Sequence, residues 1–239
     1  MASTLIVDQL QKTGGSTTAL TLPTSNASAN EFLKNDGAGA LSWAEAGGGL
    51  ITYTVYTGTS HTWSKSVNSP SKIIVELQAA GGSGSYGSSG ANASSGSGGG
   101  YVRKLISDLS SITSGTISIG IPGAGQTSPN SAGNDAGNTT WVDGVNTLTA
   151  GGGKAGANSG YGQAVGGTAT GGDFMIVGGI GTGNSKRGGD SYLGYPGMPL
   201  WTGEHTNGTP MGYGAGSGGS YGVASADGGS GIVIVWEYK

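Results

Sequence analysis

The sequence has no cysteine among its 239 residues. Disulfide bonds and thiolate metal sites are therefore excluded, and the redox compartment is not indicated. Charge is also scarce, because Asp, Glu, Lys and Arg make up only 10% of the chain, whereas about a quarter is usual in soluble domains. The net charge is −3, and the ten Lys and Arg residues are spread along the chain with no cluster larger than a pair. The basic surface that nucleic-acid binding requires is therefore missing.

Long apolar segments are missing as well. No apolar run approaches the roughly 20 residues that a membrane-spanning helix needs, so we expect no membrane insertion. The beginning, "MASTLIVDQLQKTGG", has no basic region followed by a long apolar one, so we expect no secretory signal. A secreted, glycine-rich matrix protein is therefore a less favoured interpretation.

Glycine is abundant, with 53 residues, of which eight lie in residues 1–80 and 45 in residues 81–239. A collagen helix is excluded because the glycines follow no strict three-residue period. The tract "GGSGSYGSSGANASSGSGGG" has the composition of a flexible linker. It nevertheless leaves one apolar segment, "IIVELQAA", and enters another, "YVRKLI". We therefore interpret it as a loop within one domain, in which glycine backbones pack in polyproline II geometry.

Strand patterns recur between these tracts. The segment "LITYTVYTGTSHTW" alternates β-branched and aromatic residues, and with "SKIIVELQAA" it should form a hairpin or neighbouring strands. The most apolar run, Ile232 to Val235, predicts a buried central strand. Further strands are expected in residues 101–106, 115–121, 139–150 and 173–177. No helix of ten or more residues is predicted, so we expect an all-β, antiparallel, sandwich-like domain with long, polyglycine II-like glycine loops.

Composition divides the chain near Gly47–Gly49. Residues 1–50 contain too few apolar side chains to build a core of their own. We expect them to stay extended or to intertwine with copies of the same chain. Residues 51–239 are expected to form the glycine-rich β domain.

Several segments together resemble a known family. "TSHTWSKSVNSPSKIIVELQAAGGSGSYG" is similar to the opening of the glycine-rich domain of bacteriophage tail fibres. "GSGGGYVRKLISDLSSITSGTISIGIPGAGQ", "GNTTWVDGVNTLTAGGGKAG", "GGDFMIVGG" and the C-terminal "GSGIVIVWEYK" follow in that family's order. The N-terminal "LKNDGAGALSW" separately resembles phage fibre stem sequence.

This resemblance implies a homotrimeric fibre in the virion tail, made in the host cytoplasm. Residues 1–50 would attach it to tail, baseplate or adaptor proteins and form the stem. Residues 51–239 would carry the distal receptor-binding part, which adheres to a host surface glycan or an outer-membrane protein. The resemblance implies no cofactor.

Catalytic patterns are weak. His61 and His205 are the only histidines, and no Gly-x-Ser-x-Gly elbow stands at a strand-to-helix turn, so we expect no catalytic triad and no metal site on one chain. An enzymatic tailspike that degrades polysaccharide remains the alternative. It needs two carboxylates about 5 to 9.5 Å apart. Four aspartates beside or near glycine are instead expected to cap turns: Asp143, Asp173, Asp190 and Asp227.

The segment 192–213, "YLGYPGMPLWTGEHTNGTPMGY", is the best candidate binding site. It carries large side chains where the resemblance leads us to expect glycine and serine. Tyrosine and tryptophan supply large contact areas with few rotatable bonds. The alternative is that these side chains fill a small satellite core or pack between copies. The receptor-binding candidates are Tyr192, Tyr195, Trp201, His205, Met211 and Tyr213.

Overall fold

The computed structural model describes residues 9–10, 20–29, 31–38, 40–45, 48–66, 69–88, 93–158, 162–183, 187–201 and 208–239. The chain divides into two compact units, Met1–Gly49 and Leu50–Lys239, called unit 1 and unit 2 below. The described residues contain strands and turns but no helix, and hence no helix able to cross a membrane. The predicted all-β fold is confirmed.

Unit 1 has two pairs of antiparallel strands. The first joins β1 (Gln9–Leu10) to β2 (Leu20–Thr21), and the second joins β3 (Glu31–Asn35) to β4 (Leu41–Glu45). Phe32 and Leu33 of β3 are exposed, and none of the described side chains of this unit is buried. The described part of this unit therefore has no hydrophobic core. Two-stranded hairpins without such a core are marginally stable at best in water.

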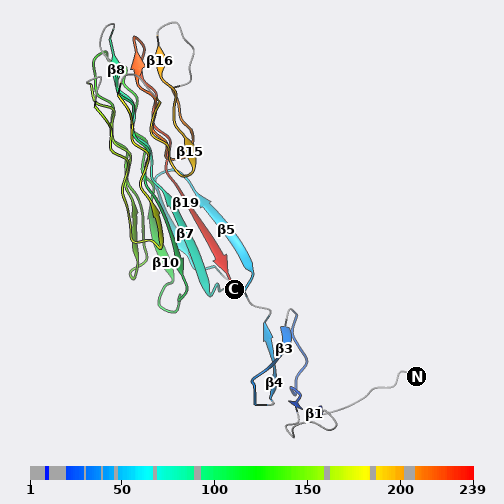
Figure 1. Ribbon diagram of the computed structural model, residues 1–239. Helices are drawn as coiled ribbons and strands as arrows, with labels where there is room; N and C mark the ends of the chain where they lie inside the picture. The colour runs from blue at the N-terminus through cyan, green and yellow to red at the C-terminus, as the bar shows by residue number, and fades with distance from the viewer. Residues whose placement is uncertain are drawn as a thin grey trace. The chain divides into compact units, whose positions relative to one another are not determined.

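Unit 2 contains two five-stranded antiparallel sheets (Figure 1). Sheet I has the order β14 (Phe174–Ile176), β9 (Tyr101–Ile106), β7 (Lys72–Gln78), β19 (Ile232–Tyr238) and β5 (Leu50–Tyr56). Sheet II has the order β13 (Ala169–Thr170), β12 (Thr147–Ala150), β11 (Thr139–Val142), β10 (Ser114–Ser118) and β6 (Ser60–Ser64).

One hydrophobic core lies between the two sheets, which confirms the predicted β-sandwich character. The rings of Trp63 and Trp141, both from sheet II, lie 5.6 Å apart and belong to the same buried cluster as Val75 and Val233 of sheet I. Each buried indole finds a partner for its N–H. Trp63 Nε1 donates to Glu237 Oε1 at 2.8 Å, and Trp141 Nε1 donates to an Asp143 oxygen. The apolar ring bodies therefore fill the core without leaving these donors unpaired.

The predicted pairing of the two strands in residues 50–80 is wrong. In sheet I, β19 lies between β5 and β7, and the adjacent β6 belongs to sheet II. The physical reason is the composition of β19, whose Val233 and Val235 point into the core while its backbone pairs with strands on both sides. The most apolar strand thus occupies the interior of the sheet, as its sequence predicts.

Beyond the sandwich, the chain continues in glycine-rich segments that run side by side (Figure 1). We call these segments the glycine layer. Since β7 pairs with β9, the chain from Ala79 to Gly100 leaves sheet I and returns to it. The glycine layer consists of residues 79–88, 93–100, 119–126, 131–138, 151–158, 162–168, 177–183, 187–201 and 208–231.

Backbone hydrogen bonds in the glycine layer repeat every three residues. Along residues 93–100, each neighbouring segment receives hydrogen bonds from N–H groups three positions apart. Ser95 and Gly98 donate to residues 179–182, Gly96 and Gly99 to residues 214–217, and Ser97 and Gly100 to residues 151–154, with N···O distances of 2.7 to 3.0 Å. The carbonyl groups of the same segment accept from three further segments, at residues 79–85, Gly167 and Gly189. Segment 93–100 is therefore enclosed by hydrogen-bonded backbone on all sides.

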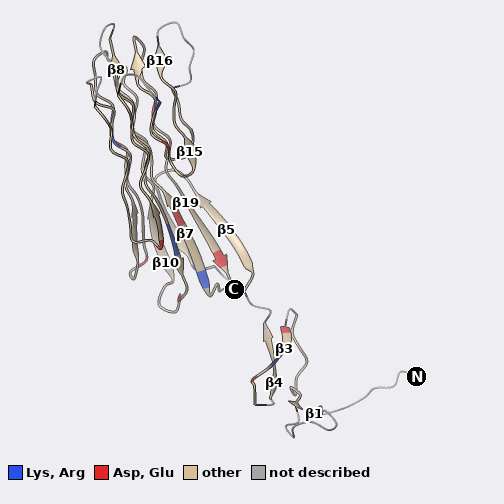
Figure 2. Cartoon of the chain, viewed as in Figure 1, with Lys and Arg blue, Asp and Glu red and all other residues tan. Residues whose placement is uncertain are grey.

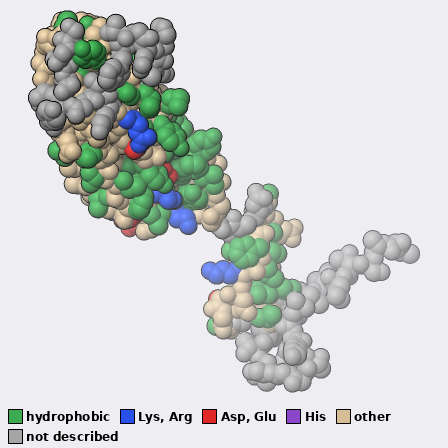
Figure 3. Space-filling view, turned by 45° about the horizontal axis from the view of Figure 1, so that its top comes forward, with side chains coloured by type: hydrophobic (Ala, Val, Ile, Leu, Met, Phe, Trp, Pro, Cys, Tyr) green, Lys and Arg blue, Asp and Glu red, His purple; other side chains and the backbone are tan. Residues whose placement is uncertain are grey.

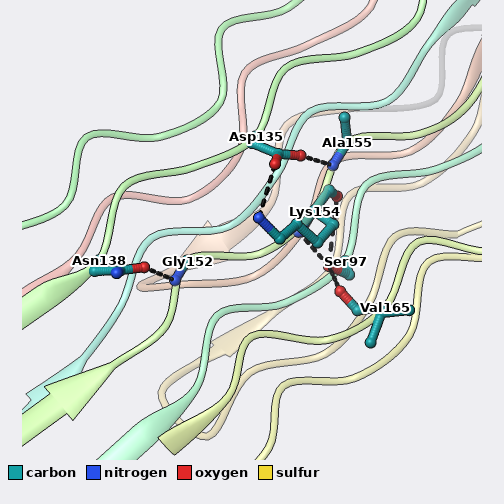
Figure 4. A network of polar contacts seen from close by, with 7 residues as sticks. All are labelled: Ser97, Asp135, Asn138, Gly152, Lys154, Ala155 and Val165. Carbon is teal, nitrogen blue, oxygen red and sulfur yellow. Dashed lines mark hydrogen bonds and ion pairs between the residues drawn. The ribbon is translucent and has the colours of Figure 1, made fainter.

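Close backbone packing explains why this segment is rich in glycine. A Cβ atom added to Gly98 would lie 1.9 Å from the carbonyl oxygen of Asp190. Serine occurs where its hydroxyl forms hydrogen bonds with neighbouring segments. Ser97 Oγ donates to the Val165 carbonyl at 2.7 Å and accepts from Lys154 N at 2.6 Å (Figure 4). The layer is thus held by backbone groups and short hydroxyls rather than by large side chains.

Candidate functional site

Tyr192 lies on sheet I at the border between the sandwich and the glycine layer. Its ring centroid is 4.3 Å from that of Tyr101, the first residue of β9, and 6.2 Å from that of Phe174 in β14. Tyr101 is buried, and its hydroxyl donates to Glu76 Oε2 at 2.8 Å. Burial first, and then this hydrogen bond, raise the pKa of Tyr101 above its usual range. Tyr192 is therefore packed on one side and half exposed on the other.

Tyr195 and Met211 form an exposed pair next to Tyr192. They face each other across the antiparallel strands β15 (Gly194–Tyr195) and β17 (Met211–Gly212), and 72% and 67% of their surfaces are exposed. A shallow hollow lies beside them, lined by residues 190–195 together with Met211 and Gly212. Asp190 and Ser191 contribute polar side chains to its lining. The arrangement combines flat apolar surface with hydrogen-bonding groups.

The backbone under this pair is held at several points. Gly212 has a φ of +83°, which favours glycine at this turn. Tyr213 N donates to the Leu193 carbonyl at 3.1 Å, and Ser191 Oγ donates to the Tyr213 carbonyl. Leu193 N donates to Gln78 Oε1, which ties the segment to the end of β7. Tyr195 and Met211 are thus presented on a strongly constrained backbone.

Four of the six predicted binding residues come together here: Tyr192, Tyr195, Met211 and Tyr213. Trp201 does not join them, because its backbone lies in β16 (Leu200–Trp201), in a small parallel sheet with β18 (Ser220–Tyr221) and β8 (Tyr86–Gly87). Six residues at about 3.1 Å each place it roughly 19 Å from Tyr195 along the extended chain. The side chain of Trp201 and the whole of His205 lie outside the described residues.

Sequence reasoning missed two members of the site, Tyr101 and Phe174. Both lie at strand positions that the sequence marks only as apolar. They meet Tyr192 because β14 pairs with β9, with Ile176 opposite Tyr101. A local signal does exist for Tyr101, since it leads the predicted strand 101–106. Its partner could not be found without the strand pairing.

The four aspartates expected in turns have defined partners. Asp143 caps the β11–β12 turn, where Oδ1 accepts from Val145 N at 2.9 Å and from Asn146 N at 2.6 Å. The other three make ion pairs or longer-range hydrogen bonds. Asp173 forms an ion pair with Lys104, Asp190 forms one with Arg187, and Asp227 accepts a hydrogen bond from Gly125 N. Within the described part of the chain, no group of three or more His, Asp or Glu side chains is placed to hold a metal ion.

The surface of unit 2 carries few charges and several exposed apolar side chains. Charged residues are sparse along the glycine-rich segments (Figure 2). Hydrophobic side chains gather on the face that Figure 3 presents, with a few Lys and Arg side chains among them. No protein-family model matches the chain, and no curated protein matches it significantly.

Proposed function

We propose that this chain is a bacteriophage tail fibre, a homotrimer in the virion tail that adheres to the host cell surface. The observation that carries this proposal is the exposed Tyr195–Met211 pair on the constrained backbone of the glycine layer. Rigid aromatic and methionine side chains lose little conformational freedom on binding, which favours recognition. In this proposal, unit 2 is the distal part that meets the receptor.

The glycine layer supplies the rigidity that such a fibre needs. Its three-residue repeat of hydrogen bonds is the repeat of a polyproline II helix, which has three residues per turn. We infer a polyglycine II-like lattice, in which each segment is fixed by several neighbours. A side chain on the surface of such a lattice is presented in one orientation, because the backbone beneath it cannot rearrange without breaking several hydrogen bonds.

The chemistry of the hollow fits a polar surface ligand. Aromatic rings stack on the apolar faces of sugars. The Asp190 carboxylate, although paired with Arg187, and the Ser191 oxygen, whose proton goes to the Tyr213 carbonyl, can still accept hydrogen bonds from sugar hydroxyls. A loop of an outer-membrane protein can use the same groups. Binding at one site is expected to be weak, and the copies in the fibre and in the virion multiply it by avidity.

Unit 1 supports the proposal because none of its described side chains is buried. Phe32 and Leu33 are exposed, although they belong to the longest described strand pair of this unit. Such residues are stabilised by packing against other chains. We infer that residues 1–50 form the stem with copies of the same segment and attach the fibre to a tail, baseplate or adaptor protein.

Competition for adsorption tests the function. Purified wild-type chain, incubated with the host bacterium, should reduce adsorption of the virion. The Tyr195→Ala/Met211→Ala variant should compete at least about ten-fold less well. A loss of roughly 1.4 kcal/mol of binding free energy lowers the affinity of a single site ten-fold, and avidity multiplies this loss over the copies. Val165→Ala, at an exposed apolar residue elsewhere in the layer, is the matched control.

The outcomes separate site from function. Failure of the wild-type chain to compete, or to bind the bacterium at all, would contradict the proposed adhesion. Equal competition by the double variant and the wild type would leave adhesion standing and move the site, with Trp201→Ala as the next variant. Loss of polysaccharide viscosity in the same mixture would favour the enzymatic tailspike instead.

A further inference from the structure

The outward face of sheet I carries apolar side chains in two adjacent rows. Strand register defines the rows, because residues paired across a sheet share a face. One row runs through Tyr53, Trp236, Ile74 and Leu105, and the next through Val55, Ile234, Glu76, Arg103 and Phe174. The large apolar residues at the ends of these rows are about half exposed. They are Tyr53, Val55, Leu105 and Phe174, with exposed fractions of 46% to 56%.

Among the described residues of unit 2, the chain covers only the row closest to the glycine layer. In that row, Gln78 is fully buried and accepts from Leu193 N, and Tyr101 is buried beneath Tyr192. The covering segment, residues 187–195, reaches no further than this row and the Phe174 ring in the described structure. The remaining two rows therefore present an apolar surface to solvent.

The edge of this sheet is unpaired as well in the described part of unit 2. β5 pairs with β19 on one side only, and its sequence, LITYTVY, contains neither a charged residue nor proline. Natural edge strands usually carry such residues or are covered, because free N–H and C=O groups invite pairing with another chain. Thr52 and Thr54, on the opposite face of β5, are exposed too. A second strand could therefore reach this edge from either face.

The exposed apolar surface is as large as the largest apolar patch of a typical monomer, and such patches are often functional. Five half-exposed side chains, each with about 200 Å² when free, amount to about 500 Å²: Leu50, Tyr53, Val55, Leu105 and Phe174. The largest apolar patch of a typical monomer is about 300 to 600 Å², and a stable interface buries about 800 Å² per partner. With the partly exposed Ile74, Ile234 and Trp236 and the β5 edge added, the face approaches the area of an interface.

Charge on this face suits a second copy of the same chain. Glu76 and Arg103 lie within the rows and pair with each other, with 3.8 Å between Oε1 and Nε. Lys72 lies at the end of the face, 5.9 Å from the Tyr238 ring centroid. Two such faces can meet without strong repulsion. In addition, β5 directly follows unit 1, so copies joined through unit 1 would hold their β5 strands at high local concentration.

We propose that the outward face of sheet I, with the β5 edge, is the contact between copies of this chain. The proposal rests on the homotrimer of the proposed function and assigns the surface that forms it. It also assigns two roles to sheet I. The self-contact lies on the uncovered rows and the receptor site on the segment that covers the third row, and the Phe174 ring borders both.

Thiol labelling of the full-length chain tests this contact, because the natural sequence has no cysteine. Leu105→Cys places one thiol on the proposed contact, and Val145→Cys places one on an exposed turn of sheet II. In the native assembly, Leu105→Cys should react with a maleimide at least ten-fold more slowly than Val145→Cys. After denaturation the two should react at the same rate.

A charge variant provides the second measurement. Tyr53→Lys/Leu105→Lys should shift the sedimentation mass from oligomer toward monomer, whereas Val145→Lys should not. Circular dichroism should show the same β signal in both variants. If the double variant does not fold, the labelling comparison still decides the question.

Two results would overturn the proposal. Equal labelling rates in a wild-type assembly that is oligomeric would move the contact to another surface, while the fibre function would stand. A wild-type chain that sediments as a monomer at micromolar concentration would remove both this contact and the homotrimer.

Discussion

The sandwich and the glycine layer of unit 2 both have buried interiors, but different groups fill them. In the sandwich, large side chains such as Trp141 and Leu148 are fully buried between two sheets. In the glycine layer, residues 93–100 are equally buried, yet the interior consists of backbone and short side chains. The sandwich gains stability from apolar area removed from water. The layer gains it from hydrogen bonds, and it can form only where glycine lets backbones approach.

The difference predicts opposite responses to a change in side-chain size. Removing atoms should damage the sandwich, because the remaining structure cannot fill the cavity. Adding atoms should damage the layer, because a Cβ meets a neighbouring backbone.

The largest effect is expected for Trp141→Ala. Trp141 is fully buried against Trp63, so its removal should lower the free energy of unfolding by about 3 to 5 kcal/mol. Urea denaturation followed by circular dichroism measures the change. Val145→Ala, at an exposed position of the neighbouring turn, should stay within about 0.5 kcal/mol of the wild type. Similar losses in both variants would show that the sandwich core does not limit stability.

Gly98→Ala should destabilise the glycine layer by about 1 to 3 kcal/mol or more, because the added methyl group overlaps the Asp190 carbonyl. Gly137→Ala is the matched control, since its Cβ would meet its nearest neighbour at 3.1 Å near the surface of the layer. Thermal melts of the two variants provide the comparison. A layer that tolerates both changes equally would not be closely packed.

Ser217→Ala should cost about 1 to 3 kcal/mol, because it leaves a buried donor unpaired. Ser217 Oγ accepts from Gly84 N and donates to the Ala226 carbonyl, each at 2.7 Å. Ser118→Ala is the control, because it removes an exposed hydroxyl on β10 rather than a buried one. Equal stability of the two variants in urea would contradict the role assigned to the buried hydroxyls.

The smallest effect is expected in the stability of the fold at acid pH. Burial raises the pKa of Asp143, but hydrogen bonds from Trp141, Asn146 and Val145 outweigh it and hold that pKa below its ordinary value. A carboxyl whose pKa is lower in the folded state stabilises the fold above its unfolded pKa, near 4. This contribution is lost as the pH falls through the folded pKa. Melts of the wild type between pH 6 and pH 2 should therefore decline more steeply than those of Asp143→Asn, and parallel curves would contradict the assignment.

The sequence predicted the sandwich well because its signals are local. The strands around Trp63, Trp141 and Ile232–Val235 stand out by their apolar and β-branched residues. Strand order was not predictable in the same way, since β19 enters between β5 and β7 from the far end of the chain. Nor could the sequence show that Tyr53 and Leu105 remain uncovered, because large apolar residues occur on both faces of their strands, β5 and β9.

The candidate site was predictable in part for the same reason. Tyr195 and Met211 stand out as large residues within a glycine-rich segment, and they are exposed and adjacent in the structure. Trp201 stands out equally, yet an extended backbone carries it away from the pair. In the glycine layer, composition indicates close packing, but glycine carries no side chain to specify which segments become neighbours. That information comes only from the hydrogen-bond pattern.

Hydrogen exchange of the backbone amides tests the central claim most directly. If the glycine layer is a folded interior, the amides of residues 95–100 should exchange as slowly as those of β7 and β19, with the exposed turn residue Gly144 as the fast reference. Slow exchange across this glycine-rich segment is the result that the account predicts. Exchange within seconds, at the rate of an unstructured peptide and alongside a protected sandwich, would contradict it.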